Sequence, residues 1–577
     1  MKVPTLVTPA LLFDQGNRYV APVFQRYYVW DATQLDSLFN DIDQSIEDMD
    51  SDKKTFLGAI VLQDRGRQGP TEPHDFLIID GQQRLTTIYL ILSCFAKLDL
   101  EFDNGDRANI IMTRYLADGA PGPRLGKPKL IPTLQDRHSL WSYLKTHLAS
   151  MEWNFETDRG DRSKGKCITP QLDRIERELK DRLLGTGDSW DSDYADLLLM
   201  AILEHLEFVN IQLDASDDAN ETFRKLNFEG TDLGIADLVR NDVFSRFNKP
   251  TDAKNFYTDK WVKFEEGFPD GELDKYFYPF AIIKFEGAAT VSSAFPQLRS
   301  AWKDHKAKDV LADLKKYQQF YCSLCRRKQL SGLSAELNAL VYRMSRMPRT
   351  RVVWPFIIQV LAAVRSGDLG DDLGVADCSI VESFMVRRAL TGKEPTGLHA
   401  VFKVLWKKSG GDPGEVIDNI VSKTIEYPDD NQLKHSVTRD AVDTRTILPY
   451  VLQELEFSHR ISIGSDPLSA EDIENQTIEH VLPQKLNVSW GGAFTQEQHE
   501  KLVGTIGNLV ALSGKQNKSL KAKPWSDKRS RYAGSNWQTT QEVAKAGTWG
   551  PASIKKRTRE MCDWILDRWP ELDHFVP

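Results

Sequence analysis

Hydrophobic and polar positions follow two different periods near the N-terminus. In ATQLDSLFNDIDQSIE, apolar residues recur at 35, 38, 39, 42 and 46, the spacing of one helix face, and Asp31 or Thr33 is placed to cap that helix. The runs TFLGAIVLQD and DFLIID are short, apolar and bounded by Gly, Pro and charged residues, so they predict two strands. A strongly apolar helix starting in GQQRLTTIYLIL follows directly.

Helical spacing dominates the rest of the chain. Residues 190–245, around VNIQLDASDDANETFRKLNFEGTDLGIADLVRNDVF, predict two helices, and residues 250–430 predict a mostly helical bundle. Further on, TRTILPYVLQELEF predicts a helix, NLVAL a short strand, and KQNKSL a turn into a helix. Together with a β-rich segment at 18–30, these elements predict an α+β fold that is predominantly helical.

Length and composition narrow the class of protein. A chain of 577 residues is too long for one compact core, so we expect roughly three to four folding units. It contains no run of 18 or more apolar residues, and its N-terminus lacks the layout of a signal peptide. Six scattered cysteines favour a reducing compartment. We therefore expect a cytoplasmic protein without a membrane segment.

The charge is distributed unevenly. The net charge is -9, yet the segment from Lys515 to Arg559 holds twelve Lys and Arg residues against two acids. A local basic field is what binding to a phosphate backbone requires. Trp525, Tyr532 and Trp537 interleave with these cations, so a nucleic-acid surface and an ordinary solvated surface both stay open as alternatives at this point.

A predicted strand-to-helix turn, IIDGQQRLTTIYLIL, concentrates groups suited to an anion. Asp80 and Gly81 end the strand, and Gln82, Gln83 and Arg84 begin the helix. The open N–H groups of a first helical turn attract anions, and a guanidinium group matches phosphate in shape and charge. Gly81 permits a positive φ angle. The alternative is a capped helix with polar decoration, although capping uses at most one of the two glutamines.

A second Gln–Arg pair precedes this turn. Gln25 and Arg26 lie in FQRYYVW, beside Tyr27, Tyr28 and Trp30. Aromatic rings next to a guanidinium can stack on a base or pack in a core, and this stretch alone favours the core.

These stretches together resemble a known family. QRYYVW, FLGAIVL, IDGQQRLTT and ETFRKLNFEGTDLGIADLVRND stand in the order found in the DGQQR domain, a ParB/sulfiredoxin-like α/β unit of GmrSD-type, modification-dependent restriction systems. Tyr27 departs from the family, in which many members carry Pro. The matching positions of the last motif are Phe223, Leu226, Asn227, Gly230, Leu233, Asp237, Leu238 and Asn241.

The resemblance implies binding and hydrolysis of a nucleoside triphosphate, ATP or GTP, coupled to the sensing of DNA. The nucleotide-binding residues that it implies are Gln25, Arg26, Asp80, Gly81, Gln82, Gln83, Arg84 and Asn227.

Near the C-terminus, TIEHVLPQ places Glu479 beside His480 at the edge of an apolar run. Hydrolysis of a phosphodiester needs a general base, and a histidine is suited to that role near neutral pH. It also needs a divalent metal, for which a carboxylate and a side-chain amide are suitable ligands. TIGNLVALSGKQNKSL supplies the amides of Asn508 and Asn517. A structural histidine is the alternative for His480, while His499 falls on a helix that we expect to be exposed.

The segments I-E-H-x-x-P-Q, I-G-N-L-x-x-L and a following Asn resemble the ββα-metal nuclease of the HNH type, the second half of the same GmrSD-type systems. Carried over, the resemblance makes His480 the general base, Asn517 a ligand of Mg²⁺ or Mn²⁺, and Asn508 the brace of the loop that orients His480. Glu479 would be the second ligand or would orient the base, although a strict HNH pattern has Asp or His there. Lys528 would contact phosphate.

The sequence thus predicts three parts: a nucleotide-binding, DNA-sensing domain at 1–245, a helical middle at 246–430, and an HNH-type nuclease at 431–577. The function that this implies is nucleotide-dependent cleavage of modified double-stranded phage DNA, of the type IV restriction kind, by a monomer or a homodimer. The alternative is a nucleotide-hydrolysing DNA-binding regulator or clamp whose nuclease part is inactive. Which modification and which nucleotide are recognised does not follow from the sequence.

Overall fold

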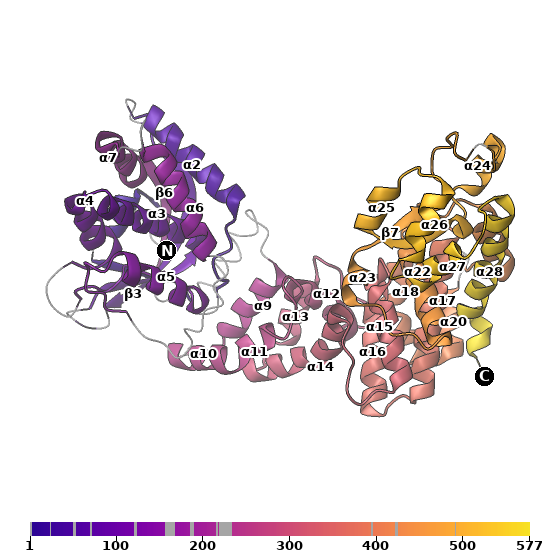
Figure 1. Ribbon diagram of the computed structural model, residues 1–577. Coiled ribbons are helices and arrows are strands. Elements are labelled where there is room, and N and C mark those ends of the chain that lie inside the picture. The colour runs from indigo at the N-terminus through magenta and orange to yellow at the C-terminus, as the bar shows by residue number, and fades with distance from the viewer. Residues whose placement is uncertain are drawn as a thin grey trace. The chain divides into compact units, whose positions relative to one another are not determined.

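The computed structural model describes residues 3–576, except for 15, 23–24, 50–52, 68, 70–71, 120–123, 156–167, 185–189, 215–216, 218–233, 248, 394–395, 422–424 and 491. The chain forms two compact units (Figure 1). Unit 1 comprises Met1–Glu265 and Trp302–Leu311, and unit 2 comprises Glu266–Ala301 and Ala312–Pro577. Helices dominate and two separate sheets are present, which confirms the predicted α+β, predominantly helical class.

A mixed six-stranded sheet, ordered β1-β6-β3-β4-β2-β5, forms the framework of unit 1. Its strands are β1 (Thr5–Val7), β2 (Asn17–Val20), β3 (Thr55–Arg67), β4 (His74–Asp80), β5 (Leu130–Ile131) and β6 (Leu206–Leu213). β3 pairs antiparallel with β4 and parallel with β6, while β2 runs parallel to both β4 and β5. The two strands predicted from TFLGAIVLQD and DFLIID are confirmed as β3 and β4.

Strand β6 corrects the prediction for residues 190–245. The VNIQL stretch was expected beside two helices and without a strand, yet it pairs with β3 over most of its length. Val209, Ile211 and Leu213 alternate with Asn210 and Gln212, which is the period of a strand. Two helices do occur within that range, α7 (Ser192–Met200) and α9 (Ile235–Phe244), separated by β6 and by undescribed residues.

Unit 1 also contains helices. They are α1 (Pro9–Phe13), α2 (Ala32–Glu47), α3 (Gln82–Glu101), α4 (Gly105–Ile110), α5 (Leu134–His147), α6 (Ile168–Leu183), α7, α9, α10 (Pro250–Phe256) and α11 (Val262–Glu265), with the π-helical turns η1 (Ile111–Leu116), η2 (Ala201–His205) and η3 (Tyr257–Trp261). Asp31 caps α2 through a capping box, as predicted. Helix α3 is buried along nearly its whole length and packs against α6 (Figure 1), so it forms the centre of the unit.

Unit 2 is built mainly of helices. They are α12 (Leu273–Lys284), α13 (Ala294–Ala301), α15 (Ala335–Arg346), α16 (Trp354–Ser366), α17 (Asp371–Leu390), α18 (Leu398–Phe402), α19 (Leu405–Ser409), α20 (Pro413–Ile420), α21 (Asp430–Arg439), α22 (Leu448–Ser462), α23 (Ala470–Glu474), α24 (Gln496–Leu502), α25 (Gly514–Leu520), α26 (Trp525–Ala533), α27 (Gln538–Ala544) and α28 (Pro551–Arg568), with 3₁₀ turns η4 (Thr350–Val353), η5 (Ile506–Asn508) and η6 (Leu572–Phe575). Helix α14 (Ala307–Arg326) begins in the segment assigned to unit 1 and continues into unit 2.

A buried ionic network ties the helical region of unit 2 to its C-terminal region. The carboxylate of Glu382 in α17 accepts hydrogen bonds from Arg343 in α15, Arg568 in α28 and the Tyr450 hydroxyl in α22. Arg568 also donates to Glu454 in α22 at 3.1 Å. Paired, hydrogen-bonded charges of this kind are costly to break, so residues on both sides of position 430 belong to one packed unit. The three-domain division stays a prediction.

Strands β7 (Gln476–His480) and β8 (Leu509–Ser513) form a small antiparallel sheet in unit 2. Figure 1 shows β7 beside α22 and α25, both of which contact it. The predicted NLVAL strand and the following helix are confirmed as β8 and α25. None of the helices in the described part of the chain has the length and apolar character needed to cross a membrane.

Candidate functional site

The turn between β4 and α3 in unit 1 has the backbone that the sequence predicted. Gly81 has φ 85°, and a Cβ atom added there would lie 2.6 Å from Cγ2 of Ile60. Only glycine fits without a shift of the neighbouring strand. Helix α3 begins at Gln82 without a side-chain cap, so no side chain competes for the first N–H groups of the helix.

The paired glutamines hold the preceding loop onto this turn. Gln82 donates from Nε2 to the carbonyl oxygen of Arg26 at 3.3 Å. Gln83 accepts from the N–H of Val29 at 2.9 Å and donates to the carbonyl oxygen of Tyr27 at 3.3 Å. Both glutamine side chains therefore form hydrogen bonds with the backbone of the Q-R-x-Y-x-W segment. This contact gives a physical reason for the Q-R-x-Y-x-W and DGQQR segments to occur in one domain.

The same segment is anchored from two further directions. Gln25 donates from Nε2 to the carbonyl oxygens of Ile78 and Ile79 in β4, at 2.7 and 2.9 Å. The N–H of Tyr28 donates to the buried carboxylate of Asp136 at 2.9 Å. Burial raises the pKa of Asp136 to about 6. Tyr28 is itself fully buried, so the core role that its own stretch favoured is confirmed.

Arg84 lies against a bulge in β3. Its guanidinium donates to the carbonyl oxygen of Ala59 at 2.9 Å. A Cβ atom at Gly58, which has φ 100°, would lie 3.1 Å from the Arg84 Cζ atom. The glycine of FLGAIVL thus leaves room for the guanidinium of the DGQQR motif, and the register of the β3–β6 pair shifts there between Phe56 and Ala59.

Asp80 and Arg26 differ from the other predicted nucleotide-binding residues in the contacts that their side chains make. Among the described residues, the Asp80 carboxylate and the Arg26 guanidinium make no hydrogen bond or ion pair. Both side chains are half-buried. Asp80 ends β4, and Arg26 lies in the loop that Gln82 and Gln83 hold. They are the charged groups that this turn leaves available to a ligand. Asn227 lies outside the described residues.

His480 stands at the end of β7 in unit 2 and has an acidic partner. Its Nε2 atom lies 3.1 Å from Oδ2 of Asp443, and the two side chains are 14% and 18% exposed. Asp443 comes from the loop before α22, and its Oδ1 would lie 3.0 Å from a Cβ atom at Gly504. That glycine lets the acid approach the strand.

Asn508 holds the chain just after His480. Its Oδ1 accepts from the N–H of Leu482 at 2.7 Å, and its Nδ2 donates to the carbonyl oxygens of Leu482 and Val503 at 2.9 and 2.8 Å. The side chain is fully buried. These bonds fit the brace that the resemblance implied, through the backbone and without contact to a reacting group.

Glu479 and Lys528 form a buried ion pair beneath β7. Lys528 is fully buried, and its Nζ atom donates to Oε1 of Glu479 and to the carbonyl oxygen of His480, both at 2.6 Å. Tyr532 donates to the same carboxylate at 3.2 Å. Burial raises the pKa of Glu479 and lowers that of Lys528. Adjacent strand residues face opposite sides, so the Glu479 carboxylate lies on the side of β7 away from the His480 ring, and Lys528 is enclosed on that side.

The metal ligands Glu479 and Asn517 stay a prediction, and the structure adds Asp443 as a further oxygen donor beside His480. Asn517 uses its Nδ2 atom to donate to Thr477 Oγ1 and to the carbonyl oxygen of Ile478, at 3.0 and 2.9 Å, which leaves its Oδ1 for another role. Asp443 adds a carboxylate beside His480. Within the part of the chain that the structure describes, no three His, Cys, Asp or Glu side chains converge as a ready metal cage. A divalent ion there would need Asp443, the Asn517 amide and water.

The basic tract divides into a surface and a core. Ten of its twelve cations are exposed: Lys515, Lys518, Lys521, Lys523, Arg529, Arg531, Lys545, Lys555, Lys556 and Arg559. Arg557 instead donates to the carbonyl oxygens of Gly507 and Leu509, at 2.9 and 2.7 Å. Tyr532 and Trp537 are buried, so they do not stack on bases as the interleaved pattern suggested.

His499 and Asp443 show the limits of local sequence patterns. His499 was expected on an exposed helix, but it is buried in α24, where Nε2 lies 2.8 Å from the carbonyl oxygen of Pro483. Asp443 was missed altogether, because it lies 37 residues before His480 and no motif includes it. Asp443 could be found only by knowing that the loop before α22 packs beside β7, which the sequence does not show.

A histidine with a carboxylate partner and a set of exposed cations in the same unit are typical of the class of hydrolases that cut nucleic acid. The comparison with family models agrees with that class. Residues 10–244 match the N-terminal domain of GmrSD restriction endonucleases, and residues 427–564 match the C-terminal domain of the same family. The chain belongs to the GmrSD restriction endonucleases and is a DNA endonuclease. No curated protein matches it.

Proposed function

We propose that the protein is a type IV restriction enzyme that cuts modified phage DNA at His480, under the control of a nucleoside triphosphate bound in unit 1. The observation that carries the nuclease half is the contact between His480 and Asp443. With Nε2–H donating to Asp443, the other ring nitrogen, Nδ1, is the one that accepts a proton from water.

Three groups keep that histidine in place. Asp443 fixes the ring and stabilises its protonated form, Lys528 holds the carbonyl oxygen of His480, and Asn508 holds Leu482. A general base gains most from such fixed positioning, because misplacement by about 1 Å costs about 10²-fold in rate.

A divalent metal, Mg²⁺ or Mn²⁺, would supply charge stabilisation at the phosphate and would be held by Asp443 and the Asn517 amide oxygen. The exposed cations of the basic tract would neutralise the DNA backbone around the cut.

The nucleotide half of the proposal rests on the β4–α3 turn. Open N–H groups at the start of α3, the Asp80 carboxylate and the Arg26 guanidinium form a polar surface on a rigid framework. Arg84 and the glutamines build that surface by holding its backbone. Asp80 would hold the metal of a nucleotide–metal complex, and Arg26 would contact phosphate.

The testing experiment is cleavage of paired modified and unmodified phage DNAs by the wild type and by His480→Ala, with Mg²⁺ or Mn²⁺ and with or without ATP and GTP. We expect cutting of modified DNA only, dependent on nucleotide, and at least 10³-fold slower in the variant. The matched control is His435→Ala, because His435 is an exposed histidine on α21 of the same unit.

Equal cutting by His480→Ala and the wild type would refute the general base. Binding and nucleotide turnover without any cutting would instead favour a nucleotide-gated DNA clamp.

A further inference from the structure

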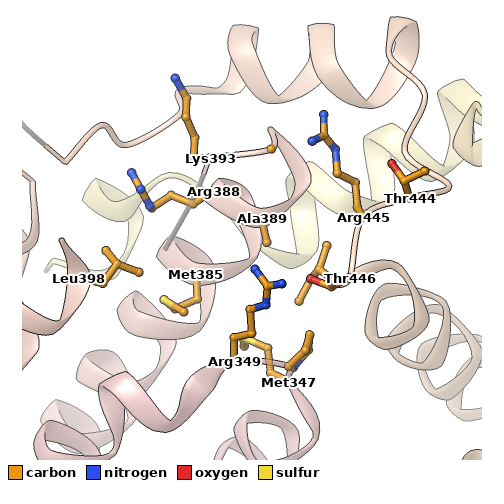
Figure 2. Close-up of a pocket in the computed structure, with 13 residues that line it drawn as sticks. Met347, Arg349, Met385, Arg388, Ala389, Lys393, Leu398, Thr444, Arg445 and Thr446 are labelled. Atoms are coloured by element: carbon orange, nitrogen blue, oxygen red, sulfur yellow. The ribbon is translucent and has the colours of Figure 1, made fainter. Parts of the chain in front are cut away.

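A cavity of about 230 Å³ lies within unit 2, and none of the site residues described above lines it. Its walls come from the segment before η4, from the end of α17 and the residues after it, and from the loop that precedes α22 (Figure 2). No described residue that lines it is acidic, whereas four are cationic: Arg349, Arg388, Lys393 and Arg445. A pocket of one charge sign attracts the opposite charge strongly, because its walls exclude water.

The three arginines surround the pocket from three separate segments. Figure 2 shows Arg349, Arg388 and Arg445 arranged around Ala389. Arg388 is only 7% exposed, and it donates to the carbonyl oxygen of Glu426. Burial lowers its pKa, so the charge is held where solvation is poor. An anion in the pocket would offset that cost.

Arg445 is seated by a glycine. A Cβ atom at Gly392, which has φ 72°, would lie 2.1 Å from Nη1 of Arg445, so only glycine allows the guanidinium to lie there. The Nε atom of Arg445 is buried without a hydrogen-bond partner among the described residues. A buried guanidinium N–H without an acceptor costs about 1–3 kcal/mol or more. Its position is therefore suited to an acceptor that comes from outside the chain.

Arg349 carries backbone strain at the same place. Its φ angle of 58° lies in the left-handed region, which costs a non-glycine residue about 1–2 kcal/mol. Strain of this kind concentrates at ligand clamps. Unlike Arg388 and Arg445, Arg349 is exposed, so it lies at the mouth of the pocket.

The remaining lining limits the ligand. Met347, Met385, Leu398 and Ile447 are buried and form an apolar floor. At the rim Lys393 pairs with Glu426, which leaves the arginines as the main attraction. Pockets for whole drug-sized ligands usually hold roughly 300–1,000 Å³, so this one fits one or two phosphoryl groups better than an intact nucleoside triphosphate.

We propose that this cavity binds a small phosphoanion carrying one or two phosphoryl groups, held by Arg349, Arg388 and Arg445. Guanidinium groups are the side chains best matched to phosphate oxygens, through paired hydrogen bonds. A free small anion fits better than a DNA backbone, since one of the three cations lies deep in the wall.

The pocket is also joined to the nuclease site by the chain itself. Thr444 and Arg445 directly follow Asp443, and the N–H of Arg445 donates to the carbonyl oxygen of Val442 at 3.0 Å, which closes a tight turn around the acid. An anion bound to Arg445 therefore restrains the turn that carries Asp443 to His480. Occupancy of the pocket would order the acidic partner of the general base.

The test is calorimetric titration of the full-length protein with inorganic pyrophosphate in metal-free buffer. The Arg84→Ala variant serves as the background, so that binding in unit 1 is reduced. We expect Arg445→Gln and Arg349→Gln each to weaken binding by about tenfold or more. Lys407→Gln, which removes an exposed cation of unit 2 outside the pocket, should leave binding unchanged. Arg349 is exposed, so its variant stays informative even if Arg445→Gln lowers stability.

Absence of binding in the wild type, or binding by both arginine variants as tight as that of the wild type, would overturn the pocket. A matching titration with a short DNA duplex separates the other source of phosphate. Arginine variants that lose DNA affinity but keep pyrophosphate binding would assign these residues to the DNA backbone instead.

Hydrogen–deuterium exchange over residues 441–448 tests the link to Asp443. We expect pyrophosphate to slow exchange of this segment in the wild type and not in Arg445→Gln. Unchanged exchange at saturating pyrophosphate would refute the coupling. Neither readout depends on nuclease activity, so a failure of the proposed restriction function would be seen separately.

Discussion

The β4–α3 turn of unit 1 and the β7–β8 sheet of unit 2 both hold the backbone around a candidate site, but they use different side-chain chemistry to do so. In both, most motif residues bind the protein's own backbone and leave one or two charged groups for a ligand. In unit 1 the holding groups are amides and one arginine: Gln25, Gln82, Gln83 and Arg84. In unit 2 they include a fully buried ion pair, Glu479 with Lys528.

This difference determines how each region should respond to substitution. A neutral amide that loses its partner leaves one hydrogen bond unmade, which costs about 1–3 kcal/mol. A buried carboxylate that loses its cation leaves a charge unpaired, which costs about 3–5 kcal/mol. The nuclease site should therefore be the more sensitive of the two to a single change in its supporting residues.

The largest effect is expected from Lys528→Met. The substitution leaves Glu479 buried without its cation and frees the carbonyl oxygen of His480. We expect a loss of about 3–5 kcal/mol in the free energy of unfolding of unit 2, measured by urea unfolding. Lys545→Met is the control, because Lys545 is exposed and its pair with Glu542 should contribute less than about 1 kcal/mol.

The double variant Lys528→Met, Glu479→Leu sharpens this result. Replacing both partners with apolar side chains should recover most of the lost stability. If Lys528 instead contacted phosphate, its loss would weaken DNA binding and leave stability unchanged, and the double variant would recover nothing.

Asp443→Asn should produce the next largest effect, on rate rather than stability. The amide can still reach His480 but cannot stabilise the protonated ring. We expect cleavage to fall by about 10²-fold, with little change in the unfolding midpoint or in DNA affinity. The exposed Asp418 on α20 offers the matched change, Asp418→Asn. A rate equal to that of the wild type would mean that Asp443 only packs beside the base.

The sequence predicted the elements of both sites well, because their signals are local. Gly81, the strand before it and the helix after it follow from hydrophobic runs and one glycine. Strand β8 and helix α25 follow in the same way. The strand β6 was missed although Val209, Ile211 and Leu213 alternate with Asn210 and Gln212, because a run this short between helical segments is ambiguous.

The roles of individual side chains were harder to predict, for a physical reason. Whether Lys528 faces solvent depends on α26 packing under β7, and a sequence pattern gives a position on an element but not its neighbour. The same holds for Asp443, whose partner is remote in sequence. The role of Asn508 came from the family resemblance, and its hydrogen bonds to the backbone of Leu482 fit that role.

The smallest expected effect is a pH dependence of the stability of unit 1. Asp136 anchors Tyr28 from a buried position, and burial raises its pKa to about 6 from 3.8. A carboxyl group whose pKa is higher in the folded state favours folding below pH 4, and that contribution is lost as the pH rises through 6. A pKa shift of this size corresponds to a loss of about 3 kcal/mol at most, because water that enters the site reduces it.

Asp136→Asn should remove this dependence, because the amide oxygen still accepts from the Tyr28 N–H and carries no charge. In calorimetric unfolding we expect the variant to gain stability relative to the wild type between pH 4 and pH 7, and the exposed Asp193→Asn to show no such trend. A constant gap across that range would mean that Asp136 stays charged when folded. The loop that contains Tyr28 would then depend on a buried charge, as β7 depends on the Glu479–Lys528 pair. The contrast between neutral and charged supporting groups in the two regions would then disappear.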